Sequence, residues 1–220
     1  MEQSWKNGDF VDHYNKIYSM KNDQIANYLE CLSLNSDDVF IDFGCGNGDM
    51  LFEASKIVKL AAGLDMSEDQ LELAKEKTKG CANVQLIKSD FLSYNPGDLI
   101  FSKASARKSL HHLTDDEKVR FIGKIAPFFK KDSLFLMEDG IFTFDRSETE
   151  EKLPQIMSEA EVYYNRKWQN IKEDFTHCIL HEFPTGINLW EKAFASGGFE
   201  IINRHHITCF YARIIAKKVV

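Results

Sequence analysis

The sequence predicts an α/β fold in which an open, mostly parallel sheet carries helices on both faces. Two observations predict these layers. Short apolar runs alternate with longer segments whose apolar residues recur at helical spacing, and two of those segments open with capping boxes. A third observation is that the last two apolar runs are too close together for a helical crossover. We therefore expect the last strand to run antiparallel to its neighbours.

The first half of the chain alternates predicted helices and strands. Apolar residues recur every three or four positions after Asn22, and Ser67 with Gln70 forms a capping box. Between the helical segments lie short apolar runs that are typical of buried strands. In chain order, the expected elements are a helix at 22–33, a strand at 38–43, a helix at 50–58, a strand at 60–65, a helix from 67 and a strand at 84–87.

The second half continues the alternation and ends in a hairpin. Thr114 and Glu117 form the second capping box, and the aromatic-rich segment 149–173 predicts one or two helices. The polar run 203–206 is expected to form the hairpin turn. The other expected elements are strands at 102–106 and 133–137, a helix from 114 to 125, a helix at 189–195, and strands at 199–203 and 207–217.

Composition places the chain among globular proteins. It has 220 residues, 44% of them hydrophobic, and no repeat or linker, so we expect a single domain over 1–220. The formal charge of −7 argues against general attraction to nucleic acid or to an anionic membrane surface. No apolar stretch approaches the roughly 20 residues of a membrane span, and the first residues lack a signal-peptide core. A cytoplasmic location is therefore expected.

The five cysteines are scattered and odd in number, which predicts reduced thiols. Cys178 and His181 have the spacing of one half of a zinc site, but no second pair stands out in the sequence. We therefore expect no metal site.

A glycine-rich loop follows the first predicted strand. Gly44, Gly46 and Gly48 remove Cβ atoms where the backbone turns sharply, which lets a ligand approach. Asp65 ends the second strand 17 residues after the last of these glycines, where a carboxylate can accept hydrogen bonds from ribose hydroxyls. Asp90 and Phe91 end the third strand, where an acid can accept from an adenine amino group and a ring can cover the base. These strand ends together predict an adenosine-shaped site.

The loop differs from the dinucleotide fingerprint. Asp49 stands where that fingerprint needs a small residue, and an acid at a helix start repels a pyrophosphate. Asp42 lies before the glycines and Asp49 after them, so the pocket favours a ligand with a positive or zwitterionic part. These features argue against an NAD-dependent oxidoreductase, and the Gly-Lys-Ser/Thr of a P-loop is absent from the sequence.

The motifs taken together resemble those of class I S-adenosylmethionine-dependent methyltransferases. The matching segments are 42–48, 63–67, 88–91, the Leu-His-His-Leu run 110–113 and Gly198-Phe199. The resemblance covers about residues 22–217. It implies a Rossmann-like, seven-stranded sheet with a reversed last strand, and S-adenosyl-L-methionine as the cofactor.

The resemblance also implies roles for particular residues. Asp42, Gly44, Cys45, Gly46 and Gly48 belong to the loop around the methionine moiety. Asp65 binds the ribose, Met66 flanks the adenine, and Asp90 and Phe91 meet its ring. Arg107 and Lys108 lie near the methionine end and the acceptor. Within an N-terminal flap expected over 1–21, Tyr14 is the residue we expect over the cofactor.

Two positions depart from the family pattern. Ser102 stands where the fourth strand often starts with an aspartate, and Arg107 and Lys108 replace residues that are usually small and neutral. Two cations there either bind the methionine carboxylate or an anionic acceptor, or pack their stems and extend their charged ends into water.

Methyl transfer from a sulfonium is a direct displacement, so a base is needed only if the acceptor loses a proton. The candidate bases are His111, Glu138 and His181, each with a packing or capping alternative. The insertion 145–185 is expected to form a lid over the acceptor. Within it we expect Tyr163, Tyr164 and Glu182 to contact the acceptor, although Tyr163 has core spacing as well.

The predicted function is methyl transfer to a small-molecule acceptor. The chain is short and acidic, so neither nucleic acid nor a membrane is an expected partner, and a monomer or homodimer is expected. The alternatives are a tRNA or protein methyltransferase, or a catalytically inactive S-adenosylmethionine-binding protein.

Overall fold

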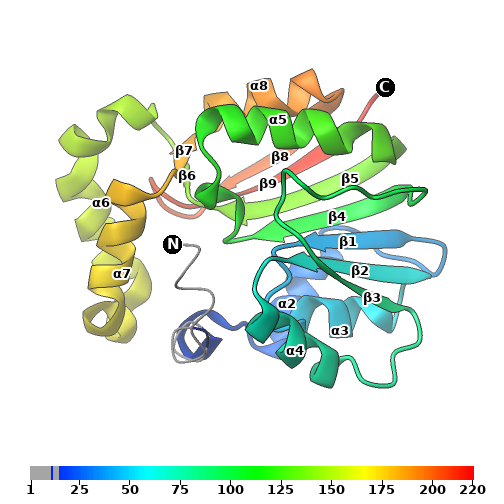
Figure 1. The fold of residues 1–220 in the computed structure, drawn as a ribbon. Coiled ribbons are helices and arrows are strands. Elements are labelled where there is room, and N and C mark those ends of the chain that lie inside the picture. The colour runs from blue at the N-terminus through cyan, green and yellow to red at the C-terminus, as the bar shows by residue number, and fades with distance from the viewer. Residues whose placement is uncertain (1–10, 12–14) are drawn as a thin grey trace.

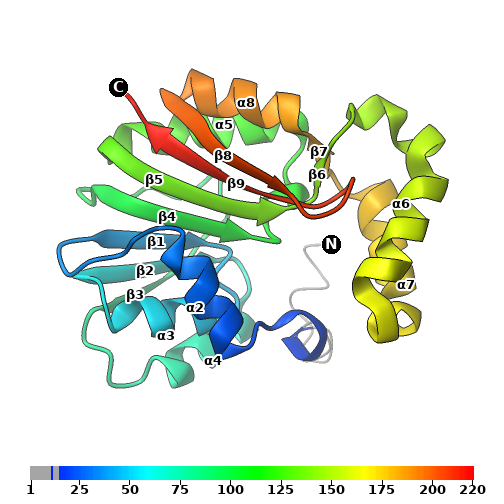
Figure 2. The same cartoon turned by 180° about the vertical axis from the view of Figure 1, so that it is seen from behind.

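The computed structural model describes residues 11 and 15–220 as a seven-stranded sheet with helices on both faces (Figures 1 and 2). The strand order is β3-β2-β1-β4-β5-β9-β8. Strands β1 to β5 are parallel, and β9 runs antiparallel to both β5 and β8. The predicted mostly parallel sheet with a reversed last strand is confirmed.

The strands and helices of the first half follow the predicted order. Ser67 accepts a hydrogen bond from the Gln70 N–H at 3.3 Å and so begins α4 where the capping box predicted it. The elements are α2 (Asn22–Glu30), β1 (Val39–Phe43), α3 (Asp49–Ser55), β2 (Leu60–Asp65), α4 (Glu68–Lys77), β3 (Val84–Lys88) and β4 (Phe101–Arg107).

The second half adds two helices at one end of the sheet. Thr114 and Glu117 form the predicted capping box at the start of α5. The elements are α5 (Asp115–Ile125), β5 (Phe129–Asp139), β6 (Ile141–Phe142), α6 (Thr149–Tyr164), α7 (Trp168–His181), β7 (Thr185–Gly186), α8 (Ile187–Ser196), β8 (Phe199–His206) and β9 (Ala212–Lys218). Short 3₁₀ helices lie at Leu110–His112, Ala126–Phe128, Arg146–Glu148 and Asn165–Lys167.

Two apolar cores hold the helices to the sheet, one on each face. Helices α5 and α8 pack Phe121 and Trp190 against one face, and α2 and α3 pack Tyr28 and Leu51 against the other. A third core joins α6 and α7 to the turn between β8 and β9, with Phe210 at its centre. Figure 1 shows α6 and α7 standing beyond the carboxyl ends of β4 and β5.

The hairpin turn lies later in the chain than predicted. Residues 203–206 belong to β8, and the turn spans 207–211. β8 is an edge strand whose outer residues are exposed, so a polar run there does not end the strand. Phe210 and Tyr211 are buried, which holds the turn against the third core. The short parallel pair β6 and β7 was not predicted.

Candidate active site

The glycine loop between β1 and α3 adopts the backbone conformation that its sequence predicted. The φ angles of Gly44, Gly46 and Gly48 are +77°, +51° and +78°, in the left-handed region. A Cβ on Gly44 would lie 2.4 Å from the Ser109 Cβ, and one on Gly48 would lie 2.9 Å from the Ala74 Cα. A Cβ on Gly46 would have nothing nearer than 3.8 Å. Gly44 and Gly48 therefore serve close packing, and Gly46 leaves room for a ligand.

Asp65 at the end of β2 orders this loop. Its carboxylate accepts from the Gly46 N–H and from the Ser67 N–H, both at 2.9 Å. Burial raises the pKa of Asp65 above its usual range, against the effect of these hydrogen bonds. Each carboxylate oxygen can accept a second hydrogen bond, so Asp65 can bind a hydroxyl-bearing ligand while it holds the loop.

Asp42 at the end of β1 is buried beside the same loop. Ser105 donates a hydrogen bond to its Oδ1 at 2.5 Å. Burial raises the pKa of Asp42 to about 7, although the Ser105 hydrogen bond acts in the opposite direction. The negative form of Asp42 is therefore stabilised by a cationic group that approaches it.

Three other predicted cofactor residues, Met66, Asp90 and Phe91, lie at the same edge of the sheet. They differ in how far their side chains already make contacts within the protein. Asp90 Oδ1 accepts from the backbone N–H groups of Leu92 and Ser93, at 2.9 and 2.8 Å, and so closes the turn after β3. The ring of Phe91 packs at 5.4 Å from that of Phe121. Met66 is 41% exposed.

The thiol of Cys45 points away from the loop surface. A Cβ on Gly63 would lie 2.9 Å from the Cys45 Sγ, so the thiol occupies the space that Gly63 leaves in β2. Cys45 is buried, and its N–H donates to the Leu64 carbonyl at 3.0 Å. Cys45 therefore presents its backbone to this site.

Glu138 at the end of β5 is held by two arginines. Its Oε1 lies 3.3 Å from the Arg107 Nε and accepts from the Tyr211 hydroxyl at 3.0 Å, and its Oε2 lies 2.7 and 2.6 Å from two nitrogens of Arg213. Burial opposes ionisation, but Arg107 and Arg213 outweigh it and hold the pKa of Glu138 below its usual value. Such a carboxylate is a weak base.

Arg107 also donates to the backbone carbonyl of Tyr18 at 3.3 Å, which ties β4 to the N-terminal segment. The described end of that segment lies on the glycine loop. Asn15 exchanges two hydrogen bonds with Gln70, at 3.1 and 3.2 Å, and Asn47 donates to Ser19 at 3.3 Å. Tyr14 lies outside the described residues.

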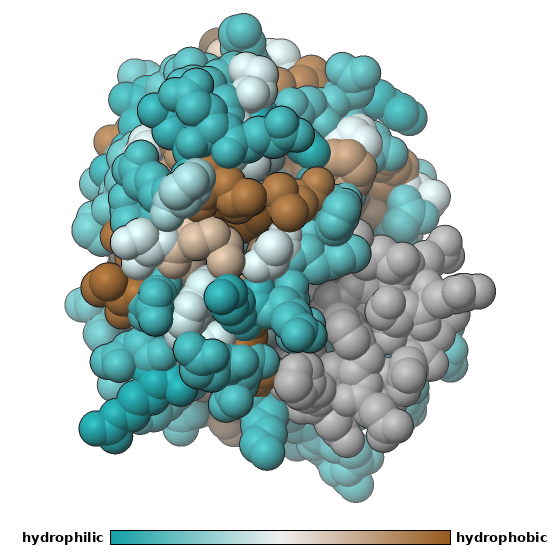
Figure 3. Space-filling view, turned by 90° about the vertical axis from the view of Figure 1, so that its left-hand side faces the viewer, coloured by the Kyte–Doolittle hydropathy of each residue, from teal (hydrophilic) through white to brown (hydrophobic). Residues whose placement is uncertain are grey.

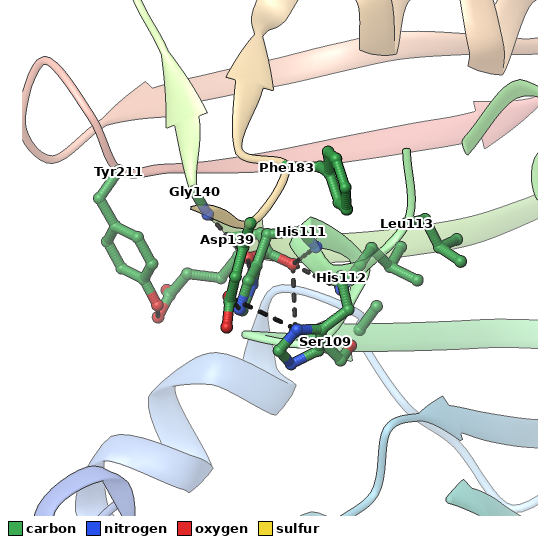
Figure 4. A network of polar contacts seen from close by, with 12 residues as sticks. Ser109, His111, His112, Leu113, Asp139, Gly140, Phe183 and Tyr211 are labelled. Carbon is green, nitrogen blue, oxygen red and sulfur yellow. Dashed lines mark hydrogen bonds and ion pairs between the residues drawn. The ribbon is translucent and has the colours of Figure 1, made fainter. Parts of the chain in front are cut away.

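A second polar network lies at the ends of β4 and β5, and its residues point toward one another (Figure 4). His111 Nδ1 lies 2.5 Å from Asp139 Oδ1. His111 Nε2 lies 3.1 Å from Glu182 Oε2, and His112 Nδ1 lies 3.4 Å from the same oxygen. Two of the predicted residues, His111 and Glu182, therefore meet directly, although 71 positions separate them in the chain.

Backbone groups anchor Asp139 in this network. Its Oδ2 accepts from the N–H groups of Ser109, Leu110 and His111, at 3.1, 2.8 and 3.3 Å, and its Oδ1 accepts from the Gly140 N–H at 2.7 Å. These bonds and the facing His111 outweigh burial and hold the pKa of Asp139 far below its usual value. Asp139 is thus an ionised, fixed carboxylate behind His111.

A cavity of about 170 Å³ opens beside this network. His111, His112 and Glu182 line it together with Lys108, Tyr164 and Tyr211. Burial lowers the pKa of Lys108 to about 7, and its ammonium lies 4.4 Å from the centre of the Tyr18 ring.

A neighbouring cavity of about 420 Å³ is lined by Arg107 and Tyr163. The two cavities share Tyr18, Lys108 and Tyr164. His181 lies at the end of α7 with its side chain exposed, and it lines neither cavity. Figure 3 shows the side of the molecule that α6 and α7 form, where apolar residues make a patch among polar ones. Val162, Tyr163 and Leu180 are exposed apolar residues of these helices.

Sequence reasoning missed Arg213, Tyr211 and Cys178 as neighbours of the site. Arg213 and Tyr211 bind Glu138 from β9 and its preceding turn, and Cys178 of α7 lies against His111 and Glu182. Arg213 carried one usable signal, since it is a charge next to the apolar run 214–216. Within residues 11 and 15–220, no helix is long and apolar enough to cross a membrane.

Comparison with known proteins identifies the family to which the chain belongs. The family model described as a methyltransferase domain matches residues 34–198. An uncharacterized methyltransferase of Anoxybacillus flavithermus is 27% identical over 166 residues, which are 76% of this chain and 71% of the relative. An uncharacterized methyltransferase of a Geobacillus strain is 26% identical over 198 residues, with 87% and 83% covered.

Solved structures share the fold at low sequence identity. Magnesium protoporphyrin IX methyltransferase from Synechocystis PCC 6803 with bound SAH has a TM-score of 0.69 at 13% identity, covering 99% of this chain and 97% of the other. Geranyl diphosphate C-methyltransferase from Streptomyces coelicolor, in complex with Mg²⁺, geranyl diphosphate and S-adenosyl-L-homocysteine, has a TM-score of 0.67 at 12% identity, with 96% and 82% covered. With the family model and the strand order, these findings place the chain in the methyltransferase domain family, as a class I S-adenosylmethionine-dependent methyltransferase.

Proposed function

We propose that the protein transfers the methyl group of S-adenosylmethionine to a small-molecule acceptor bound between the ends of β4 and β5 and helix α7. The observation that carries this proposal is the pair of adjoining cavities, about 170 and 420 Å³, walled by α6, α7 and residues 17–20. Walls of this kind suit a metabolite, whereas a duplex or a folded protein needs an open surface. The charge of −7 also disfavours a nucleic-acid substrate.

The glycine loop fits the cofactor on its own geometry. A Cβ on Gly46 would meet only the Gln70 side chain, at 3.8 Å, and the Asp65 carboxylate beside it retains acceptor capacity for ribose hydroxyls. Asp42 would face the cationic amino group of the methionine moiety. The positive charge of that group would stabilise the ionised form of Asp42, which burial disfavours. When bound, S-adenosylmethionine supplies a methyl group activated by the positive sulfur.

The adenine ring of the cofactor would lie along the ends of β2 and β3. Met66 is exposed enough to flank an adenine, and Phe91 stands next to Gly44 at the loop. Asp90 would accept from the adenine through the capacity that its hydrogen bonds with Leu92 and Ser93 leave. Tyr14 is retained as a proposed contact from the N-terminal flap.

The acceptor side is assigned to α6, α7 and the histidine network. Tyr163 and Tyr164 would bound the acceptor from α6, and Glu182 with His111 would face it from the other side. These groups would orient the acceptor for in-line displacement and exclude water. His111, which Asp139 orients, lines the smaller cavity, whereas Glu138 lines neither cavity and is held ionised by two arginines.

The test combines cofactor binding with methyl transfer. Titration calorimetry with S-adenosylmethionine, and separately with NAD, should give micromolar binding of the first alone. Mass spectrometry should then detect methyl transfer to members of a pool of small hydroxyl, thiol and amine acceptors, and none to bulk tRNA or a protein lysate. Transfer to tRNA or protein only would overturn the small-molecule assignment.

A matched pair of variants tests the acceptor site. Tyr163→Ala removes a ring from the larger cavity, whereas Val162→Ala changes the neighbouring residue of α6, which is 79% exposed. We expect a several-fold rise in acceptor KM for the first variant and an unchanged value for the second. Equal effects of the two would argue against an acceptor site at α6.

A further inference from the structure

We propose that His111, His112 and Glu182 form a binding site for one divalent transition-metal ion, such as Zn²⁺, at the wall of the smaller cavity. Among residues 11 and 15–220, these three place one ligand atom each within 4.8 Å of one another. Glu182 is buried, and the three side chains all line the cavity. The assignment replaces the expectation, drawn from the cysteine spacing, that the chain has no metal site.

The separations between the ligand atoms fit a single ion. Metal–nitrogen and metal–oxygen bonds of about 2.1 Å place neighbouring ligand atoms about 3.4 Å apart in a tetrahedral site and about 3.0 Å apart in an octahedral one. Glu182 Oε2 lies 3.1 Å from His111 Nε2 and 3.4 Å from His112 Nδ1. Both separations match those of two ligands on one ion, and all three atoms lie within 4.8 Å of one another.

The surroundings of His111 have the form of a metal site's outer shell. A metal-binding histidine commonly donates its second ring N–H to a carboxylate, which fixes the tautomer and the orientation of the ring. His111 Nδ1 lies 2.5 Å from Asp139 Oδ1, which leaves Nε2 to face Glu182. Asp139 is itself fixed by the N–H groups of Ser109, Leu110 and Gly140.

The donor set selects the class of metal. Two imidazole nitrogens with one carboxylate oxygen suit Zn²⁺ and the neighbouring divalent ions, whereas Mg²⁺ and Ca²⁺ prefer oxygen ligands alone. Two carboxyl groups, Asp139 and Glu182, are buried beside the two imidazoles, so acidic groups are at hand to offset the charge of a divalent ion. Three protein ligands also leave a coordination position open toward the cavity, which is the pattern of catalytic rather than structural zinc sites.

The use of such an ion rests on the proposed function. A hydroxyl or thiol acceptor that coordinates the ion loses its proton to solvent more readily, because the metal stabilises the resulting anion. The anion's oxygen or sulfur then forms a bond to the methyl carbon as the bond from that carbon to the cofactor sulfur breaks, and that sulfur leaves as a neutral thioether. His111, His112 and Glu182 would hold the ion, and Tyr164 and Tyr211 would confine the acceptor beside it.

The experiment measures metal binding directly on the full chain. After treatment with a chelator, the protein is titrated with Zn²⁺ against a chromophoric chelator, and with Co²⁺ by absorption spectroscopy. We expect one equivalent of each, with visible Co²⁺ bands typical of nitrogen and oxygen ligands. His112→Ala and Glu182→Gln should weaken Zn²⁺ binding at least 100-fold, and Asp139→Asn should weaken it by roughly 10- to 100-fold.

Controls separate this site from other metal binders in the chain. His206→Ala removes an exposed histidine of β8 and should leave Zn²⁺ affinity unchanged. A sulfur-to-cobalt charge-transfer band would point to Cys178 and overturn the assignment, as would the lack of stoichiometric binding or unchanged affinity in both ligand variants. If a ligand variant fails to fold, which circular dichroism would show, the wild-type Co²⁺ spectrum still decides between the two donor sets.

Failure of this proposal is distinguishable from failure of the proposed function. Calorimetry with S-adenosylmethionine is repeated on the chelator-treated protein, where unchanged affinity is expected because the metal site lies outside the glycine loop. Acceptor methylation that persists fully without metal would overturn the role of the ion. Metal binding without methylation of any small acceptor would refute the proposed function and leave the metal site in place.

Discussion

The buried carboxyl of Asp42 should make the stability of the protein depend on pH, and this dependence can be measured. Its carboxyl is buried at the end of β1, with its pKa raised to about 7 from 3.8, so the unfolded chain ionises it at lower pH than the folded protein does. A pKa raised by about 3 units corresponds to about 4 kcal/mol of lost stability once the folded protein is fully ionised. The substitution Asp42→Asn removes this titration while preserving the shape of the side chain.

The direction in which stability changes with pH follows from proton binding. Between the unfolded pKa near 3.8 and the folded pKa near 7, the folded protein binds the extra proton, so the wild type loses stability as pH rises through this window and levels off above it. Relative to Asp42→Asn, the wild type should therefore lose about 3 kcal/mol between about pH 5 and about pH 8. The Ser105 hydrogen bond lowers the pKa, so Ser105→Ala should extend the loss to higher pH.

Urea unfolding at several pH values, without cofactor, measures this difference between wild type and variant. At about pH 8 the variant should be the more stable protein. It should nevertheless bind S-adenosylmethionine more weakly, because it lacks the negative charge that we propose for the methionine amino group. A stability difference that does not change between about pH 5 and about pH 8 would refute the reasoning.

Three further predictions concern the same strand ends. Asp65→Ala should weaken S-adenosylmethionine binding more than tenfold in calorimetry, since it removes the acceptor of the Gly46 N–H and the acceptor that we propose for the ribose. Glu138→Gln should lower the free energy of unfolding by about 3 kcal/mol in urea, because Arg107 and Arg213 lose a shared buried counter-charge; full stability with a large fall in kcat would make Glu138 a base instead. Asp90→Ala should loosen the turn after β3 and raise cofactor Kd several-fold; an unchanged Kd would remove Asp90 from the site.

Much of the fold was readable from local patterns because those patterns report local physics. The Ser67 cap and the Thr114 capping box fix helix starts through hydrogen bonds within one turn, and β2 occupies the predicted residues 60–65. The hairpin turn was misplaced because the exposure of β8 at the sheet edge decides whether a polar run continues a strand. That edge position depends on β9 pairing with β5, which lies far away in the chain.

The candidate site likewise has some features that follow from the local sequence and others that depend on tertiary structure. The sequence by itself determined the strand-end carboxylates Asp42 and Asp65 and the glycine loop, because parallel strands bring their carboxyl ends to one edge whatever packs around them. Only the tertiary structure decided that Gly48 packs tightly on the backbone of α4 while Gly46 has just the Gln70 side chain near it, since atoms distant in the chain set each environment.

The histidine network depended on tertiary structure most of all. His111 and Glu182 are 71 residues apart and meet because the end of α7 lies against the segment after β4. The sequence determined which residues can ionise or bind a metal. Packing of distant elements decided which of these residues share a cavity, because burial and facing charges act through space and not along the chain.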